Sequence, residues 1–159
     1  GSTTAVLAAV AGGYIVAALV SGRLGDRFGI ARVIFLCSFV YGAALLLGGL
    51  AVQWHSWYLP LIFLAAIAGG SVMTLAWGLL FTLMPAADRG AIAGLATTTK
   101  GFGLLIGPLL AGGAIDLLER YFPETHGYQV LWPICALPVL LVIPLVASLT
   151  VRAESRSIA

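Results

Sequence analysis

The sequence predicts an all-α polytopic membrane protein with five transmembrane helices. Of its 159 residues, 61% are hydrophobic and only 9% are charged, whereas an ordinary soluble domain carries about 25% charged residues. The charged residues gather in short turns, and long apolar stretches separate them. So few charges could not keep this much apolar surface in water, and lipid must therefore be part of the solvent.

Five apolar stretches are long enough to cross a bilayer, which takes roughly 20 residues in a helix. In hydrocarbon each backbone group must find its hydrogen bond within the segment, so each stretch is expected to be a helix. Between Arg89 and Asp116 only Lys100 carries a charge. The expected spans, within a single transmembrane domain of residues 1–159, are 3–22, 31–53, 58–84, 90–117 and 128–150.

The arginines predict the orientation. If the turn at residues 21–32 is cytoplasmic, alternation of the spans puts six arginines on the cytoplasmic side and only Arg120 outside. This is the positive-inside bias, and it predicts an N-terminus outside and a C-terminus in the cytoplasm, in the plasma (inner) membrane. Aromatic residues flank both expected outer loops, as an interfacial belt would: Trp54, Trp57, Tyr58, Tyr121, Phe122, Tyr128 and Trp132.

Several function classes lack support in the sequence. A net charge of +2 without a long basic run gives no reason to expect nucleic acid as a partner. His55 and His126 have no second metal ligand near them in the sequence, and Cys37 and Cys135 lie inside apolar runs, where we expect core residues. No catalytic triad, carboxylate pair or cofactor motif is present. The sequence therefore predicts no enzyme, no metal site and no cofactor.

The stretch SGRLGDRFGIAR, residues 21–32, concentrates four charged residues between two apolar spans. We expect Gly22 and Gly29 to permit a tight reversal of the chain, and Asp26, Arg27 and Arg32 to hold the turn in water. Asp26 is also expected near a helix N-terminus, where the helix dipole favours a carboxylate.

This pattern resembles motif A of the major facilitator superfamily, a Gly-x-Leu-x-Asp-Arg-Phe-Gly turn between two membrane helices. The sequence departs from the motif after Gly29, where Ile30 and Ala31 precede the basic Arg32. The resemblance implies a conformational latch on the cytoplasmic side in the outward-open state, made of Gly22, Asp26, Arg27, Gly29 and Arg32. The alternative is a plain positive-inside anchor.

The resemblance extends over essentially the whole chain. MPAADRGAIAGL, residues 84–95, looks like the loop between the fourth and fifth helices of a six-helix half, and residues 103–113 resemble the Gly-Pro-rich fifth helix. The chain would then supply helices two to six of one half. Because it stops soon after the last span, we expect the C-terminal half, helices 8–12. The missing helix and the other half would come from a separate chain or a missing segment.

Polar residues at membrane depth are the candidates for a substrate cavity. On the third span Ser71, Thr74, Gly78 and Thr82 recur at spacings of three and four, with Trp77 beside them. The equivalent helix of the family lines the cavity, and helix packing would explain the same stripe equally well.

Lys100 lies about 16 Å along the fourth span if that helix begins near Arg89, and Thr97 precedes it by one turn. An ammonium at that depth costs at least ~2.5 kcal/mol unless it meets water or a partner. We expect Lys100 in the cavity. The alternative is that the span starts later and that the lysine reaches back to the cytoplasmic interface.

Small residues and a proline mark the rest of the fourth span. Gly103, Gly107, Pro108 and Gly112 are expected either to pack against another helix or to form a hinge. The function predicted from all these features is part of a secondary active transporter, a symporter or antiporter, that moves a small solute by alternating access. The alternative is a non-transporting scaffold or regulatory subunit of the same fold.

Overall fold

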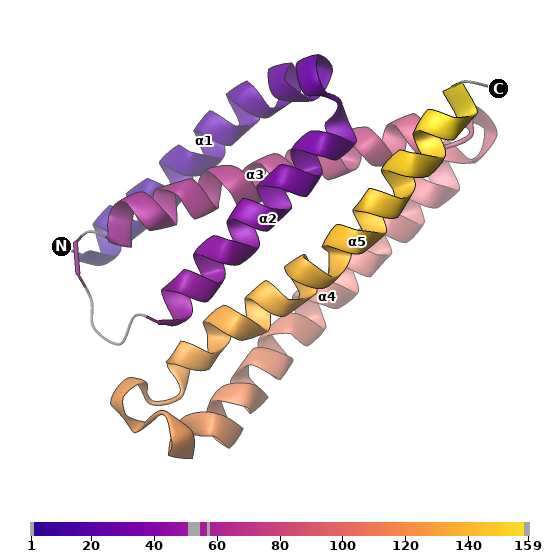
Figure 1. Ribbon diagram of the computed structural model, residues 1–159. Helices are drawn as coiled ribbons and strands as arrows, with labels where there is room; N and C mark the ends of the chain where they lie inside the picture. The colour runs from indigo at the N-terminus through magenta and orange to yellow at the C-terminus, as the bar shows by residue number, and fades with distance from the viewer. Residues whose placement is uncertain (1, 51–54, 57, 158–159) are drawn as a thin grey trace.

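The computed structural model describes residues 2–50, 55–56 and 58–157. Five long helices run through this part of the chain, and each is antiparallel to the one before it (Figure 1). Each is long and apolar enough to span a membrane, so the all-α polytopic fold is confirmed. They are α1 (Ser2–Phe28), α2 (Ile30–Gly49), α3 (Tyr58–Leu83), α4 (Arg89–Leu118) and α5 (Leu131–Ser157).

Short 3₁₀ turns make up most of the described connections. One lies between α3 and α4, at Ala86–Asp88, and three lie between α4 and α5. These three are Glu119–Tyr121, Pro123–Thr125 and Tyr128–Val130. Alternation of the helices puts the α1–α2 turn, the α3–α4 turn and the C-terminus at one end of the molecule (Figure 1).

Helices extend past the ends of several expected spans. The first span was expected to end at residue 22, yet α1 continues to Phe28, and α5 continues past residue 150 to Ser157. Charged residues stop the apolar span but not the helix, because a helix can continue into water. Residues 51–53 of the second expected span, with Trp54 and Trp57 of the expected aromatic belt, lie outside the described residues.

The reversal between α1 and α2 takes a single residue, Gly29. Its φ of +88° belongs to a region that glycine adopts readily and other residues rarely do. The Gly29 amide donates to the carbonyl of Gly25 (2.9 Å), and the Gly29 carbonyl accepts from Val33 (3.2 Å). Gly22 lies inside α1 and takes no part in the turn, so its expected role in the reversal is wrong.

A row of small residues brings α1 against α3. Gly13, Ala17, Ser21 and Gly25 recur every fourth residue, and all four are buried. A Cβ atom on Gly13 would lie 2.6 Å from the Cβ atom of Ala66, so only hydrogen fits there. The Ser21 hydroxyl is buried and has no hydrogen-bond partner among the described residues. We call these four residues the α1 seam.

The second close approach joins the C-terminal end of α2 to the start of α5. A Cβ atom on Gly48 would lie 2.6 Å from the Trp132 ring. Beside it, the Gln129 side-chain amide donates to the carbonyl of Gly49 over 2.6 Å. Trp132, expected in the interfacial belt, therefore also holds two helices together.

The buried core lies between α1, α2 and α3, around Val33, Ile34 and Leu75. Cys37 packs against this cluster, as expected for a core residue. Cys135 is exposed, so its expected place in the core is wrong. In a membrane protein an apolar residue can face lipid, and an apolar run therefore does not identify the core.

Helix α4 stands apart from this core. None of its residues is buried, and it packs mainly against α5 and the neighbouring turns. Cβ atoms placed on Gly103, Gly107 and Gly112 would meet nothing within 4 Å. These glycines therefore do not pack against another helix within the described part of the chain, and their role in packing or as a hinge stays a prediction.

We predict that Gly13→Val destabilises the protein and that Gly103→Val does so far less. At residue 13 the new side chain would overlap α3, and overpacking of this kind typically costs about 1–3 kcal/mol. At residue 103 the space is open. Unfolding in detergent, followed by circular dichroism, measures both variants. Equal losses of stability would contradict the role of the α1 seam.

Candidate functional site

The charged groups of the motif-A-like turn lie on both sides of Gly29. Asp26 and Arg27 are in the last turn of α1, Arg32 is in the first turn of α2, and all three are exposed. The Arg27 guanidinium carbon lies 5.4 Å from the centre of the Phe28 ring. Two helix ends therefore present these charges together, with one glycine between them.

Asp26 does not stabilise the start of α2. No side chain caps that helix at Gly29, and Asp26 lies near the C-terminal end of α1, where the helix dipole disfavours a carboxylate. The expected stabilisation by a helix N-terminus is therefore wrong, because the extra turn of α1 moves Asp26 to the other pole of the dipole.

The polar stripe of α3 has a buried side and an open side. Ser71 is buried, only 3% exposed, and forms a side-chain hydrogen bond with Cys37 of α2. Thr74 and Thr82 are exposed, and each hydroxyl donates to a carbonyl one turn earlier, over 2.9 Å and 2.7 Å. Ser71 thus contributes to the α2–α3 contact, and the threonines lie toward open space.

Trp77 lies at the edge of this stripe and is half-buried. Its ring is tilted against the ring of Phe81, with 6.1 Å between the ring centres. A large aromatic face therefore borders the open side of α3, close along the helix to Thr74.

On α4, the segment from Thr97 to Lys100 is polar and exposed. The Thr97 hydroxyl donates to the Ala93 carbonyl over 2.9 Å. The Thr98 and Thr99 hydroxyls likewise donate to the carbonyls four residues earlier, those of Gly94 and Leu95. Each hydroxyl has thereby satisfied its one donor within the helix. Its oxygen can still accept a hydrogen bond, so this turn offers acceptors beside a cation.

Helical spacing puts Lys100, Leu104, Gly107, Ala111 and Ile115 on one face of α4. Near the C-terminal end of α4 this face meets the rest of the chain, where the Cβ position of Gly127 lies 2.7 Å from the Ile115 carbonyl oxygen. Further along the helix, at Lys100, Leu104 and Gly107, the same face is exposed. The lysine is therefore on the face by which α4 touches its neighbours, at a level where nothing described covers it.

The candidates do not form one site within the described chain. Helix α3 packs against α1 and α2, whereas α4 packs mainly against α5, so the polar residues of α3 and those of α4 belong to different packing units. Pro108 lies inside an uninterrupted α4.

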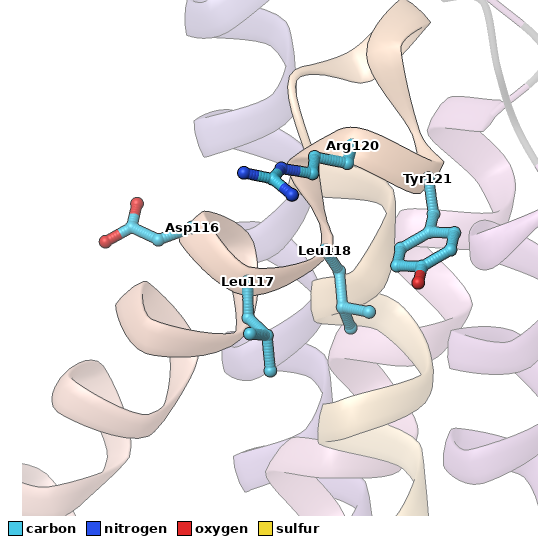
Figure 2. A pocket seen from close by; sticks show the side chains of 5 residues that line it. All are labelled: Asp116, Leu117, Leu118, Arg120 and Tyr121. Atoms are coloured by element: carbon cyan, nitrogen blue, oxygen red, sulfur yellow. The ribbon is translucent and has the colours of Figure 1, made fainter.

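The C-terminal end of α4 has a feature that the sequence interpretation missed. Asp116, Leu117, Leu118, Arg120 and Tyr121 line a hollow of about 580 Å³. Figure 2 shows the Asp116 and Arg120 side chains directed to the same side of the helix end, away from Tyr121. The spacing of four residues between these opposite charges could have placed both side chains on one side of the helix.

An unexpected pair of titratable side chains, His126 and Glu119, lies just beyond this hollow. The His126 ring nitrogen Nδ1 lies 3.6 Å from a Glu119 carboxylate oxygen, and both side chains are largely exposed. Screening by water makes such a surface pair weak, so it helps little to hold the connection between α4 and α5 in place.

Comparison with known proteins identifies a family. The family model of the Major Facilitator Superfamily matches residues 1–158. No curated protein and no solved structure matches the chain. The match covers nearly the whole sequence, and the five apolar helices agree with the family's membrane fold. The chain is therefore an integral membrane protein that belongs to the major facilitator superfamily, a family of transporters.

Proposed function

We propose that the chain is part of a secondary active transporter that moves a small anionic or polar solute by alternating access. Lys100 carries the proposal. It is the chain's one lysine, it lies about 16 Å along α4, and it is exposed on the face that α4 turns toward its neighbours. A charge at that depth is tolerated when it meets water or a partner, and such charges in membrane helices commonly line solute pathways.

The solute would bind between α3 and α4, once the rest of the transporter encloses the space between them. Lys100 would attract its anionic or polar part, and Thr97 would accept a hydrogen bond beside it. Thr74 and Trp77 would contribute a polar atom and an aromatic face from α3. Ser71 would support the site indirectly, because its hydrogen bond to Cys37 fixes α3 against α2.

The charged turn at Gly29 would act as the conformational latch. Two rigid helices joined by one residue transmit a movement of either helix end to the other. The turn would lie in the cytoplasm, with the N-terminus of the chain outside and the membrane being the plasma (inner) membrane. The five helices would be helices 8–12, and the other half of the transporter would complete the cavity.

Lys100→Ala is expected to raise the KM for uptake of an anionic solute about tenfold or more, because a hydrogen bond to a charged group contributes about 1.5–3 kcal/mol. Stability should be unchanged or higher, since a costly charge is removed. Uptake of a panel of radiolabelled small organic anions into proteoliposomes identifies the solute and measures its KM. Lys100→Arg should restore binding only in part, because the guanidinium is planar and larger.

Leu105→Ala is the matched control for this test. Leu105 lies on the opposite face of α4, is 69% exposed and is predicted to leave the KM within twofold. The proposal is wrong if Lys100→Ala transports with an unchanged KM, or if Leu105→Ala and Lys100→Ala are equally impaired.

Asp26→Asn is expected to lower the transport rate several-fold while the amount and the stability of the protein stay the same. The carboxylate lies at the unfavourable end of α1, so its removal should not weaken that helix. A lowered rate would then come from a contact made in one transport state. Arg23→Gln, one turn earlier on α1, is the control. Normal transport by Asp26→Asn at equal abundance would leave the turn only the role of an anchor.

A further inference from the structure

A groove lies between the last turns of α1 and the first turns of α2. Its volume is about 470 Å³. Its walls are mostly apolar, with two guanidinium groups among them. The residues that line it are Leu24, Arg27, Phe28, Arg32, Val33, Leu36 and Cys37.

The groove has a charged end and an apolar end. Arg27 and Arg32 lie two and three residues from Gly29, at the level where the chain reverses. Leu24 and Leu36 lie one turn or more deeper on α1 and α2. Since both helices run from this turn into the membrane, the groove runs in the same direction, with its cations at the water-facing end.

The apolar wall is open to the surroundings. Phe28 is 53% exposed and Leu36 is 61% exposed, and both belong to helices that span the membrane. In a bilayer, an exposed apolar wall of this kind fits a lipid acyl chain. A phospholipid has the same polarity as the groove, because its phosphate lies at the interface and its acyl chains point inward.

We propose that this groove binds a phospholipid with an anionic headgroup, of the phosphatidylglycerol class, from the leaflet at the Gly29 end. The guanidinium groups of Arg27 and Arg32 donate hydrogen bonds to the phosphate, for which planar guanidinium is well shaped. One acyl chain lies along Leu24 and Leu36. Arg27 can turn toward a phosphate readily, because its contact with Phe28 at 5.4 Å is a weak one at an exposed site.

The volume limits how much of the lipid is held. A site of this size is comparable to the pockets of small-molecule ligands, about 300–1,000 Å³. It accommodates a headgroup and the first part of one chain, and the rest of the lipid stays in the bilayer. The binding is therefore selective for the headgroup charge rather than for the length of the chains.

Native mass spectrometry of the detergent-solubilised protein tests this directly. The protein is incubated with equal amounts of phosphatidylglycerol and phosphatidylcholine of the same chain length, and the ratio of the bound lipids is measured. We expect phosphatidylglycerol to be favoured about tenfold. Arg27→Gln should lower this ratio about fivefold or more, and Arg27→Lys should keep most of it. The measurement is independent of transport, so it stands or fails apart from the proposed function.

Arg23→Gln is the matched control, because Arg23 is one turn away on the same helix and does not line the groove. It should change the ratio less than twofold. If Arg23→Gln and Arg27→Gln lower the ratio equally, the preference reflects general surface charge and the site is wrong. An excess of sn-glycerol 3-phosphate, which has no acyl chains, should not displace the lipid, and displacement would overturn the proposal. A ratio of one in the unaltered protein would overturn it as well.

Discussion

The close approach of α1 to α3 is the contact on which the rest of the arrangement depends. Lipid gives apolar helices little reason to associate, so packing of small residues has to provide it. At Gly13 the two helices are too close for any side chain, and the α1 seam repeats this fit down to Gly25. The seam positions the end of α1 against α3, and with it the Gly29 turn and the arginine-lined groove. Helix α2 starts at that turn, and α5 packs against α2.

The five long apolar helices were predictable because the cost of charge in lipid is a strong local constraint. Gly29 was predictable as the reversal, since a sharp turn requires a positive φ. The errors at Gly22 and Asp26 share one cause: a charged residue ends the apolar span, but the helix continues for as long as its backbone bonds can form. Asp26 consequently lies at the C-terminal pole of α1 and not at the N-terminal pole of α2.

Candidate residues could be identified from the sequence where the chemistry of one residue was decisive. They could not be identified where the role depends on a contact with another helix. Lys100 stood out because a single cation interrupts an apolar span. Helical spacing alone could not show that Ser71 faces Cys37. Spacing assigns residues to one face of a helix, but it does not say which neighbouring helix packs on that face. For the same reason, the spacing of the glycines alone could not show which of them pack against another helix. The spacing of four on α1 marks a real seam, whereas Gly103 and Gly107 on α4 have no neighbour within 4 Å.

The proposed function requires that the face of α4 that carries Lys100 lines a water-filled cavity in the assembled transporter. Single cysteines placed along α4, after Cys37 and Cys135 are replaced by serine, can be tested with a water-soluble maleimide in membranes. Positions 100, 104 and 107 share the Lys100 face, and positions 102, 105 and 109 lie opposite. We expect rapid labelling at positions 100, 104 and 107 and slow labelling at positions 102, 105 and 109. Uniformly slow labelling, or labelling of the opposite face, would contradict it.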